Sequence, residues 1–433
     1  MPAGSIVVVG AGLAGLRACE GLRERGFEGR ITLVGDEPHL PYDRPPLSKQ
    51  FLSGAWDLDR VLLRSSDQMA ALGLDLRTGP SHRAVDLDLD ARRLRLASGD
   101  LLEYDGLVLA TGSAARRLPG INEVPGTYVL RTLDDALALR MVLERPGVRL
   151  GLAGAGFIGL EVAATARRLG AEVTVVEPLE VPLGRVLGPV SGRACELMHR
   201  EEGVTFHLRT VIESVEAVEG AEHTLRCRLS SGQVLEVDAL LVGIGAAPSV
   251  SWLAGSGLQV GSDGIVCDES LMAAPGVAVA GDVARWPLPV APVASGTSAP
   301  SPAASPSSPP ETVRVEHRTN AAEQGDHAAA GLLAHLGLLS AKARALDVPP
   351  SYLVPYVWSD QYDVKIQVLG LPRPDDDVTV VEGDPAERRF VALHGRGGRL
   401  EAVVGFARPR HVMALRPLLE RKATLAEAKA MFS

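Results

Sequence analysis

The chain has few cysteines, and their positions exclude several classes of protein. Cys19, Cys195, Cys227 and Cys267 are the only four among 433 residues, and wide gaps separate them. No CxxC pair, zinc-binding spacing or disulfide framework can be drawn from such positions, so we expect no metal site and no disulfide-stabilised miniature scaffold. Scattered thiols of this kind are typical of a reducing compartment, which predicts a cytoplasmic protein.

The chain also lacks a block of basic residues and a long hydrophobic run. Lys and Arg number 44 against 53 Asp and Glu, a formal net charge of −9, and no basic cluster could follow a phosphate backbone. The hydrophobic run from Ile6 is soon interrupted by glycines and by Arg17, unlike a signal peptide or a membrane span. We therefore expect neither nucleic acid nor a membrane as a partner.

The remaining composition is that of a globular protein with several domains. Hydrophobic residues make up 46% of the chain and charged residues 22%, which excludes wholesale disorder. At roughly 100–200 residues per domain, the length predicts two to four domains. Residues 287–310 depart from this composition because they are mostly Pro, Ala and Ser. We interpret this segment as a flexible, disordered loop.

Two stretches share the pattern of a hydrophobic strand, a glycine turn and a helix start. Residues 6–9 lead into GAGLAG at residues 10–15, and residues 148–150 lead into GAGFIG at residues 154–159. In such a turn the first glycine makes the bend, the second lets backbone N–H groups approach a pyrophosphate, and the third lets helix and strand pack closely. The pattern predicts an α/β fold with two Rossmann-like dinucleotide-binding domains.

Acidic residues follow both turns at a spacing that suits ribose binding. Asp36 and Glu37 come after a predicted strand at residues 30–34, and Glu177 comes after one at residues 172–176. A carboxylate at Glu177 would accept from the ribose 2′-OH of NAD and repel the 2′-phosphate of NADP, and the next two residues add no cation. This favours NAD(H) over NADP(H), although Glu177 as a simple strand cap is the alternative.

Further elements are predicted along the chain. Strands at residues 106–109 and 277–280 end next to Thr111, Gly112, Gly281 and Asp282, as expected where a sheet binds a ligand at its carboxyl edge. A helix is predicted over residues 318–339 and an amphipathic helix over residues 411–422. Short strands between them indicate a small C-terminal α+β module, with its clearest runs at residues 364–369, 378–382, 390–393 and 400–406.

Taken together, these motifs resemble the flavoprotein ferredoxin reductases of the putidaredoxin reductase type, a group that includes the reductase components of dioxygenases and is related to rubredoxin reductase and apoptosis-inducing factor. The resemblance is carried by both glycine turns and by residues 40–49, 110–112, 130–132, 281–282, 315–317 and 356–361. It implies the glutathione-reductase-like plan: an FAD-binding domain over residues 1–117 and 246–340, an NAD-binding domain over residues 118–245, and a C-terminal reductase domain over residues 350–433.

The resemblance also implies roles for individual residues. Residues implied to bind FAD are Gly10, Gly12, Ala14, Gly15, Asp36, Glu37, Arg44, Lys49, His82, Thr111, Gly112, Arg131, Asp282 and Glu316. Residues implied to bind NAD are Gly154, Gly156, Phe157, Ile158, Gly159, Glu161, Glu177, Arg185, Gly243, Ile244 and Gly245. Lys49, Glu161 and Trp358 are implied to act in catalysis, Lys49 as a cation beside the flavin, Glu161 toward the nicotinamide and Trp358 on the flavin side that faces an iron–sulfur partner.

The cysteine positions also separate the functions open to such a flavoprotein. Disulfide reductases need a redox cysteine pair at the flavin, and their NADH oxidase and peroxidase relatives need a single cysteine shortly after the first βαβ unit. No cysteine lies between Cys19 and Cys195, and Cys19 itself is on the helix directly behind the first glycine turn, where we expect it to pack. We therefore expect an FAD-dependent oxidoreductase that passes electrons from NADH to a [2Fe–2S] ferredoxin or a rubredoxin-like carrier, serving an oxygenase or a cytochrome P450. An excess of basic residues over residues 403–433 suggests a docking face for an acidic ferredoxin.

Two alternatives stay open at this point. The acceptor could be a small molecule, such as a quinone or a monodehydroascorbate-like radical, in place of a protein. The chain could also be a redox-sensing interaction protein similar to apoptosis-inducing factor.

Overall fold

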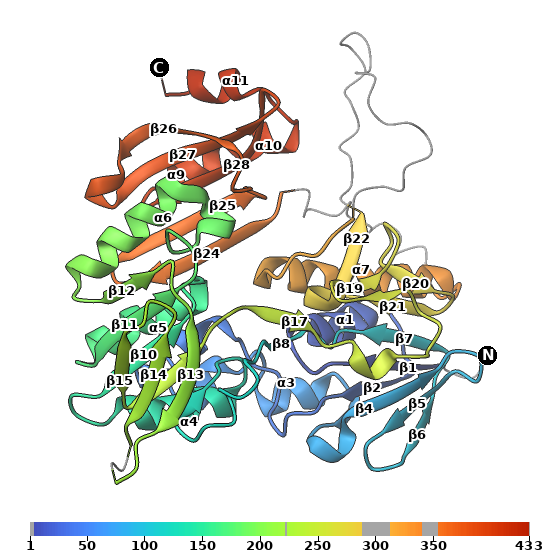
Figure 1. The fold of residues 1–433 in the computed structure, drawn as a ribbon. Helices are drawn as coiled ribbons and strands as arrows, with labels where there is room; N and C mark the ends of the chain where they lie inside the picture. Colours follow the sequence, from blue (N-terminus) through green and yellow to red (C-terminus); the bar gives the residue numbers. More distant parts are fainter. Residues whose placement is uncertain (1–3, 221–222, 288–311, 340–353, 433) are drawn as a thin grey trace. The chain divides into compact units, whose positions relative to one another are not determined.

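The computed structural model describes residues 4–220, 223–287, 312–339 and 354–432 (Figure 1). The predicted loop at residues 287–310 lies outside the described residues apart from Pro287, as do residues 350–353 of the predicted C-terminal domain. Contacts within the chain divide it into two compact units. The first unit comprises residues 1–43, 62–113 and 247–355, and the second comprises residues 44–61, 114–246 and 356–433.

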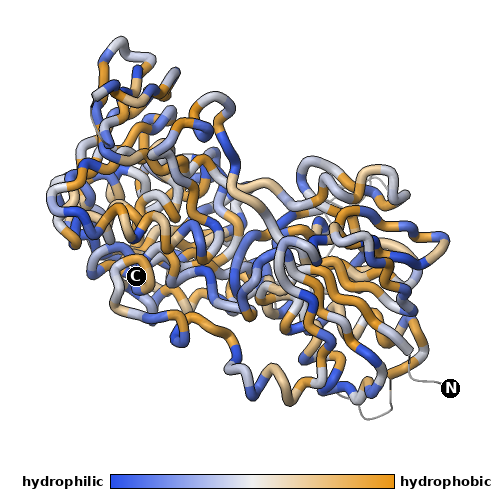
Figure 2. Tube along the Cα trace, turned by 90° about the horizontal axis from the view of Figure 1, so that it is seen from below, coloured by the Kyte–Doolittle hydropathy of each residue, from blue (hydrophilic) through white to orange (hydrophobic). Residues whose placement is uncertain are grey.

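A largely parallel sheet forms the core of the first unit (Figure 1). Its central strand β1 (Ser5–Val9) lies between β7 (Gly106–Leu109) and β2 (Arg30–Val34) and is parallel to both. Beyond β2 lies β3 (Leu74–Arg77), and beyond β7 lie β21 (Val277–Val279) and the antiparallel β20 (Met272–Ala274). Such strands are buried on both faces and therefore read as hydrophobic runs, which Figure 2 shows along the trace of this unit.

Helices α1 and α7 pack against each other in the first unit. α1 (Leu13–Glu24) follows β1 through the first glycine turn, and Arg25 just beyond it donates to Asp326 of α7 at 2.7 and 2.9 Å. α7 (Arg318–His335) ends before the predicted residue 339 because the chain turns at Gly337, which has φ +68°. The other elements of this unit are α3 (Ser66–Ala71), the sheet of β4 (Ala84–Asp88), β5 (Arg93–Leu96) and β6 (Leu101–Glu103), and the sheet of β18 (Val260–Gly261), β19 (Gly264–Val266), β22 (Ala284–Pro287) and β23 (Thr312–Val313).

The second unit repeats the parallel arrangement around β10 (Arg149–Ala153). β11 (Glu172–Glu177) and β16 (Ala239–Val242) flank β10, with β12 (Thr205–Leu208) and β9 (Thr127–Tyr128) at the two edges. The part of this unit before the C-terminal residues also contains the helices α2 (Leu58–Val61), α4 (Leu133–Leu143), α5 (Phe157–Arg168) and α6 (Gly184–Glu201). A separate antiparallel sheet is formed by β13 (Ile212–Ala217), β14 (Leu225–Leu229) and β15 (Val234–Val237). The chain passes between the units in β8 (Ser113–Ala115) and β17 (Ala246–Pro248).

An antiparallel sheet from the C-terminal part of the chain also belongs to the second unit. Its strands lie in the order β24 (Tyr356–Gln361), β25 (Val364–Gly370), β28 (Arg399–Phe406), β27 (Arg389–Arg396) and β26 (Asp377–Asp384). Phe390 and Phe406 stack in its core with ring centroids 4.6 Å apart. β24 packs against α5, so this sheet is joined to the Rossmann-like part of the unit.

The structure confirms the predicted α/β class and both strand–turn–helix patterns, and besides the shorter α7 it corrects the predicted C-terminal helix. Residues 411–422 do not form a single helix, because α9 (Pro409–Ala414) ends at Leu415 and α10 (Arg416–Glu420) begins directly after it. Pro417 has no N–H to continue the helical hydrogen bonds, which explains the break. A further short helix, α11 (Leu425–Ala430), follows. None of the helices in the described part of the chain is long and apolar enough to cross a membrane.

Candidate functional site

The first glycine turn, between β1 and α1, is close-packed at two of its glycines and open at the third. Gly10 has φ +115°, and a Cβ there would lie 2.1 Å from the carbonyl oxygen of Ala110. A Cβ at Gly15 would lie 1.9 Å from the carbonyl oxygen of Gly10. At Gly12, by contrast, a Cβ would meet no atom of the described residues within 4 Å. The fold itself therefore requires Gly10 and Gly15, whereas Gly12 leaves space beside the start of α1.

The second turn, between β10 and α5, has the same three properties. Gly154 has φ +100°, and its Cβ would lie 2.6 Å from the carbonyl oxygen of Gly243. A Cβ at Gly159 would lie 2.8 Å from the carbonyl oxygen of Gly154, while one at Gly156 would meet nothing within 4 Å among the described residues. Each open glycine stands at the N-terminus of a twelve-residue helix, where unpaired N–H groups and the helix dipole favour an anion. Both turns thus fit a pyrophosphate.

Acidic side chains stand at the ends of the second strands, as predicted, but they differ between the two units. Glu177 is buried, and its carboxylate accepts from the backbone N–H of Ala155 at 2.6 Å and of Leu179 at 3.0 Å. A carboxylate has about four lone-pair sites, so Glu177 retains acceptor capacity for a ribose hydroxyl. In the first unit Asp36 is exposed, and Glu37 accepts from the hydroxyl of Tyr42 at 2.5 Å.

Residues around Asp282 hold the carboxyl edge of the first unit's sheet. The Asp282 carboxylate accepts from the Ser113 hydroxyl at 3.0 Å, and its carbonyl oxygen accepts from Arg314 at 3.1 Å. Arg314 also forms an ion pair with Glu316. Gln324 of α7 accepts from the N–H of Gly281 at 2.9 Å and so fixes the turn that presents Asp282. Sequence reasoning missed Ser113 and Gln324 because their partners are far away in the chain.

Other residues predicted to bind FAD make contacts within the first unit. Thr111 donates to the carbonyl oxygen of Ser249 at 3.0 Å, and Gly112 has φ +65°. His82 is half-buried, with Nδ1 2.8 Å from the carbonyl oxygen of Thr78. Ala14 is buried in α1, and a Cβ at Gly281 would lie 2.9 Å from that of Ala14.

Lys49 and Glu161, predicted separately as catalytic residues, meet in the second unit. Lys49 Nζ lies 2.7 Å from Glu161 Oε2, which also accepts from the Ser48 hydroxyl at 2.5 Å. The other carboxylate oxygen, Oε1, accepts from the Ser359 hydroxyl at 2.7 Å. Glu161 is only 5% exposed, so the pair is desolvated and held by short, charge-assisted bonds. No sequence signal identified Ser48 or Ser359 as partners.

The other predicted cofactor-binding residues that lie in the second unit are partly brought together. Arg44 donates to the carbonyl oxygen of Arg131 at 2.5 Å, so the two guanidinium-bearing segments are neighbours. The N–H of Gly243 donates to the carbonyl oxygen of Ala153, which places the run of Gly243, Ile244 and Gly245 beside the second glycine turn. Phe157, Ile158 and Arg185 lie in the first turns of their helices.

Trp358 lies on β24, where it stacks on Tyr356 with centroids 5.7 Å apart and has Lys365 Nζ 5.9 Å from its ring. It is half-buried, so one part of the ring remains accessible. Neighbouring residues of a strand point to opposite faces, and the side chain of Trp358 is therefore on the other face from that of Ser359.

No cysteine of the chain is suited to thiol chemistry. All four are free and buried. Burial raises the pKa of Cys19 and of Cys267 to about 12 and that of Cys227 to about 11, and it raises the pKa of Cys195 as well. Since the thiolate is the nucleophile, these residues are inert at neutral pH. Among the described residues, no group of three or more His, Cys, Asp or Glu could hold a metal ion.

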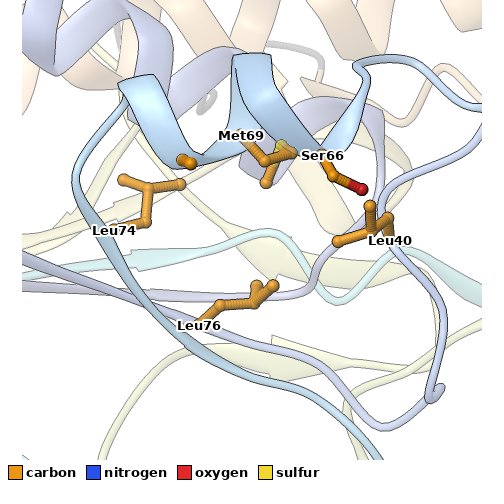
Figure 3. A pocket seen from close by; sticks show the side chains of 6 residues that line it. Leu40, Ser66, Met69, Leu74 and Leu76 are labelled. Carbon is orange, nitrogen blue, oxygen red and sulfur yellow. The ribbon is translucent and has the colours of Figure 1, made fainter.

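The first unit also contains a pocket of about 190 Å³ (Figure 3). Leu40, Met69, Leu74 and Leu76 point into it, with Ser66 and Ala70 from α3 completing its lining. The lining is apolar and brings no titratable group, so the pocket carries no chemistry of its own.

The fold and both turns define a protein that binds two dinucleotides, with a desolvated lysine–carboxylate pair and no reactive thiol. The chain belongs to the pyridine nucleotide-disulphide oxidoreductase family, which it matches over residues 4–325, and residues 356–431 match the reductase C-terminal family. It is thus an FAD-dependent oxidoreductase that uses NAD(H), as the sequence predicted.

Individual relatives agree with this assignment. The chain is 37% identical to rhodocoxin reductase of Rhodococcus erythropolis over 98% of its own length and 92% of that protein. It is 36% identical to the ferredoxin–NAD(+) reductase component of the anthranilate 1,2-dioxygenase system of Burkholderia cepacia, over 97% of this chain and 95% of that protein. A crystal structure of the covalent putidaredoxin reductase–putidaredoxin complex superposes with a TM-score of 0.84 at 31% identity, covering 98% of this chain and 94% of that chain.

Proposed function

We propose that this protein passes electrons from NADH through FAD to a [2Fe–2S] ferredoxin that serves an oxygenase or a cytochrome P450. The observation that carries the proposal is the pair of glycine turns with an open second glycine, combined with four cysteines that cannot relay electrons. The names of the relatives support the acceptor, since one is rhodocoxin reductase and another is the ferredoxin–NAD(+) reductase component of a dioxygenase system.

We assign different residues to the two proposed cofactor sites. Gly10, Gly12, Gly15 and Asp282 belong to the FAD site, and Gly154, Gly156, Gly159 and Glu177 to the NAD site. FAD held in its site would supply the chemistry that links two-electron hydride transfer from NADH to one-electron transfer to the acceptor.

The role proposed for Lys49 is to hold a positive charge in a desolvated position, where a cation stabilises negative charge that builds up on a bound ring system. Glu161 keeps that ammonium in place at 2.7 Å. Trp358 supplies an accessible aromatic surface on the face of β24 opposite to that of Ser359.

The remaining predicted roles and boundaries belong to the same proposal. Further residues proposed to bind FAD are Ala14, Asp36, Glu37, Arg44, His82, Thr111, Gly112, Arg131 and Glu316, and further ones proposed to bind NAD are Phe157, Ile158, Arg185, Gly243, Ile244 and Gly245. The proposed domains are residues 1–117 with 246–340, residues 118–245 and residues 350–433. We place the protein in the cytoplasm, since its cysteines are free and unpaired, and we propose no nucleic-acid or membrane partner.

Anaerobic stopped-flow absorbance tests the proposed function directly. The purified protein is mixed with NADH, in parallel with NADPH, and then with an oxidised [2Fe–2S] ferredoxin. We expect the flavin to bleach rapidly with NADH and the iron–sulfur absorbance to bleach afterwards. A flavin that bleaches while no ferredoxin is reduced would move the acceptor to a small molecule, and a protein that holds no flavin would refute the proposal.

A basic face over residues 403–433 is proposed as the ferredoxin docking site. Several of its cations are already neutralised, since Arg408 pairs with Glu382 at 2.7 Å and Arg421 with Glu427 at 2.7 Å. Arg410 and Lys422 are exposed, so these are the residues to reverse.

We expect the double variant Arg410→Glu, Lys422→Glu to raise the KM for ferredoxin at low ionic strength without changing ferricyanide reduction. Arg228→Glu on β14, also an exposed cation of the second unit, is the matched control. Unchanged ferredoxin reduction at low salt in the double variant would exclude this face.

A further inference from the structure

The carboxylate of Glu161 is held by side chains from distant parts of the chain. Ser48 and Lys49 both bond to Oε2, whereas Ser359 of β24 is the donor to Oε1 within the described residues. Glu161 and Ser359 are 5% and 0% exposed. The C-terminal sheet therefore reaches the lysine–carboxylate pair through one hydroxyl group.

Ser359 is itself the end of a buried chain of hydrogen bonds. Gln361 Nε2 donates to the Ser359 hydroxyl oxygen at 3.0 Å, and Gln361 Oε1 lies 2.9 Å from His199 Nε2. The hydroxyl of Tyr362 lies 3.1 Å from His199 Nδ1. Ser359, Gln361 and His199 are fully buried. Buried polar groups are costly unless they are paired, and these residues satisfy one another.

The donor and acceptor properties of these groups give all hydrogen bonds of this series the same direction of donation, from Tyr362 toward Glu161. An ionised carboxylate only accepts, so Ser359 must donate its hydrogen to Glu161 and accept from the amide of Gln361. The carbonyl oxygen of Gln361 then needs an N–H from His199 Nε2. In a neutral imidazole the other nitrogen accepts, so Tyr362 donates to Nδ1.

The protonation states agree with this direction. Burial lowers the pKa of His199 to about 4, so the ring is neutral at pH 7. Burial also raises the pKa of Tyr362, which therefore keeps the proton that it donates.

Local geometry explains how β24 supplies two links of the chain. Ser359 and Gln361 are two residues apart on a strand and so project from the same face. That face packs against α5, which carries Glu161, while His199 comes from α6.

We propose that Ser359 is a positioning residue for the Glu161–Lys49 pair, and that Gln361, His199 and Tyr362 hold its hydroxyl in the orientation that donates to the carboxylate. The inference rests on the proposed function, in which Lys49 and Glu161 serve the cofactor site. Without the Ser359 hydroxyl, Oε1 loses this donor, the carboxylate turns, and the ammonium of Lys49 follows it.

The test compares Ser359→Ala with Ser359→Thr, which keeps the hydroxyl. We expect the alanine variant to hold FAD, to lose about tenfold in the rate of flavin reduction by NADH, to shift the flavin midpoint potential, and to leave the KM for NADH nearly unchanged. The threonine variant should recover most of the wild-type rate and potential. Asp360→Asn, on the opposite face of the same strand, is the control and should change neither.

A double-variant cycle separates positioning from general damage to the fold. Gln361→Leu alone should change the rate of flavin reduction and the midpoint potential less than Ser359→Ala does. Combined with Ser359→Ala it should cause no additional change, because Gln361, His199 and Tyr362 act only through the Ser359 hydroxyl. Independent effects of the two variants, or a potential and rate in Ser359→Ala equal to those of the wild type, would overturn the proposal. If Ser359→Ala does not fold, the proposal is judged from the other two variants: Gln361→Leu should change the rate and potential, and Ser359→Thr should keep most of the wild-type values.

The potential is measured by photoreduction against a reference dye and needs no NADH. A wild-type protein that NADH fails to reduce would therefore refute the proposed function, while the positioning role would still be judged from the potentials of the variants.

Discussion

The open second glycine in each turn leads to a prediction that separates folding from cofactor binding. Gly12 and Gly156 have extended backbone angles, φ −95° and −78°, which any residue adopts, and a Cβ at either position meets no atom of the described residues. Replacing them with alanine should change the free energy of unfolding of the apoprotein by less than about 1 kcal/mol, because reduced freedom of the unfolded chain offsets the poorer helix cap.

The same methyl group should weaken binding, because it occupies the space through which the backbone N–H groups approach a pyrophosphate. Loss of one charge-assisted hydrogen bond costs about 1.5–3 kcal/mol, or roughly 10- to 100-fold in affinity. We expect Gly12→Ala to lose FAD on dilution, measured by flavin fluorescence. Gly156→Ala should keep FAD and show a raised KM for NADH.

Gly15→Ala is the contrasting variant, since its Cβ would lie 1.9 Å from the carbonyl oxygen of Gly10. It should destabilise the apoprotein by about 1–3 kcal/mol or more in urea unfolding, because backbone atoms must move apart. If Gly12→Ala bound FAD as tightly as the wild type and Gly156→Ala had an unchanged KM for NADH, the reasoning from the open glycines would be refuted.

Three further predictions concern charge. Burial lowers the pKa of His199 from 6.5 to about 4, so between these pH values the unfolded chain binds more protons than the folded one. The free energy of unfolding should therefore fall by about 3 kcal/mol as the pH drops from 6.5 to 4. Urea unfolding at several pH values should show a shallower fall for His199→Gln. Arg25→Ala removes the partner of the partly buried Asp326 and should lower the free energy of unfolding by about 2 kcal/mol, measured by urea unfolding at pH 7. Arg30→Ala is the control, and an equal loss of stability in that variant would argue against a specific Arg25–Asp326 pair. Glu177→Gln should raise the ratio of kcat/KM for NADPH to that for NADH by about tenfold, and steady-state ferricyanide reduction with both nucleotides should stay unchanged if Glu177 only caps its strand.

Local patterns along the chain were enough to predict the two dinucleotide-binding halves. A strand, a glycine turn and a helix start lie within about fifteen consecutive residues, and their spacing reflects backbone constraints that hold in any tertiary setting. Gly10 and Gly154 need positive φ, and hydrophobic runs such as residues 6–9 predict buried strands. The C-terminal helix was misjudged because hydrophobic periodicity carried through Pro417, where the missing N–H ends the pattern.

The partners of individual side chains came only from the folded chain. Glu161 could be recognised near the second glycine turn, but Lys49, Ser48 and Ser359 are 112, 113 and 198 residues away from it. The pairing depends on how α5, β24 and residues 44–61 pack, and no local pattern records which hydroxyl will face which carboxylate. The direction of each hydrogen bond is also decided by the tertiary structure, because the donor or acceptor role of Ser359, Gln361 and His199 depends on which neighbours each side chain has once it is buried.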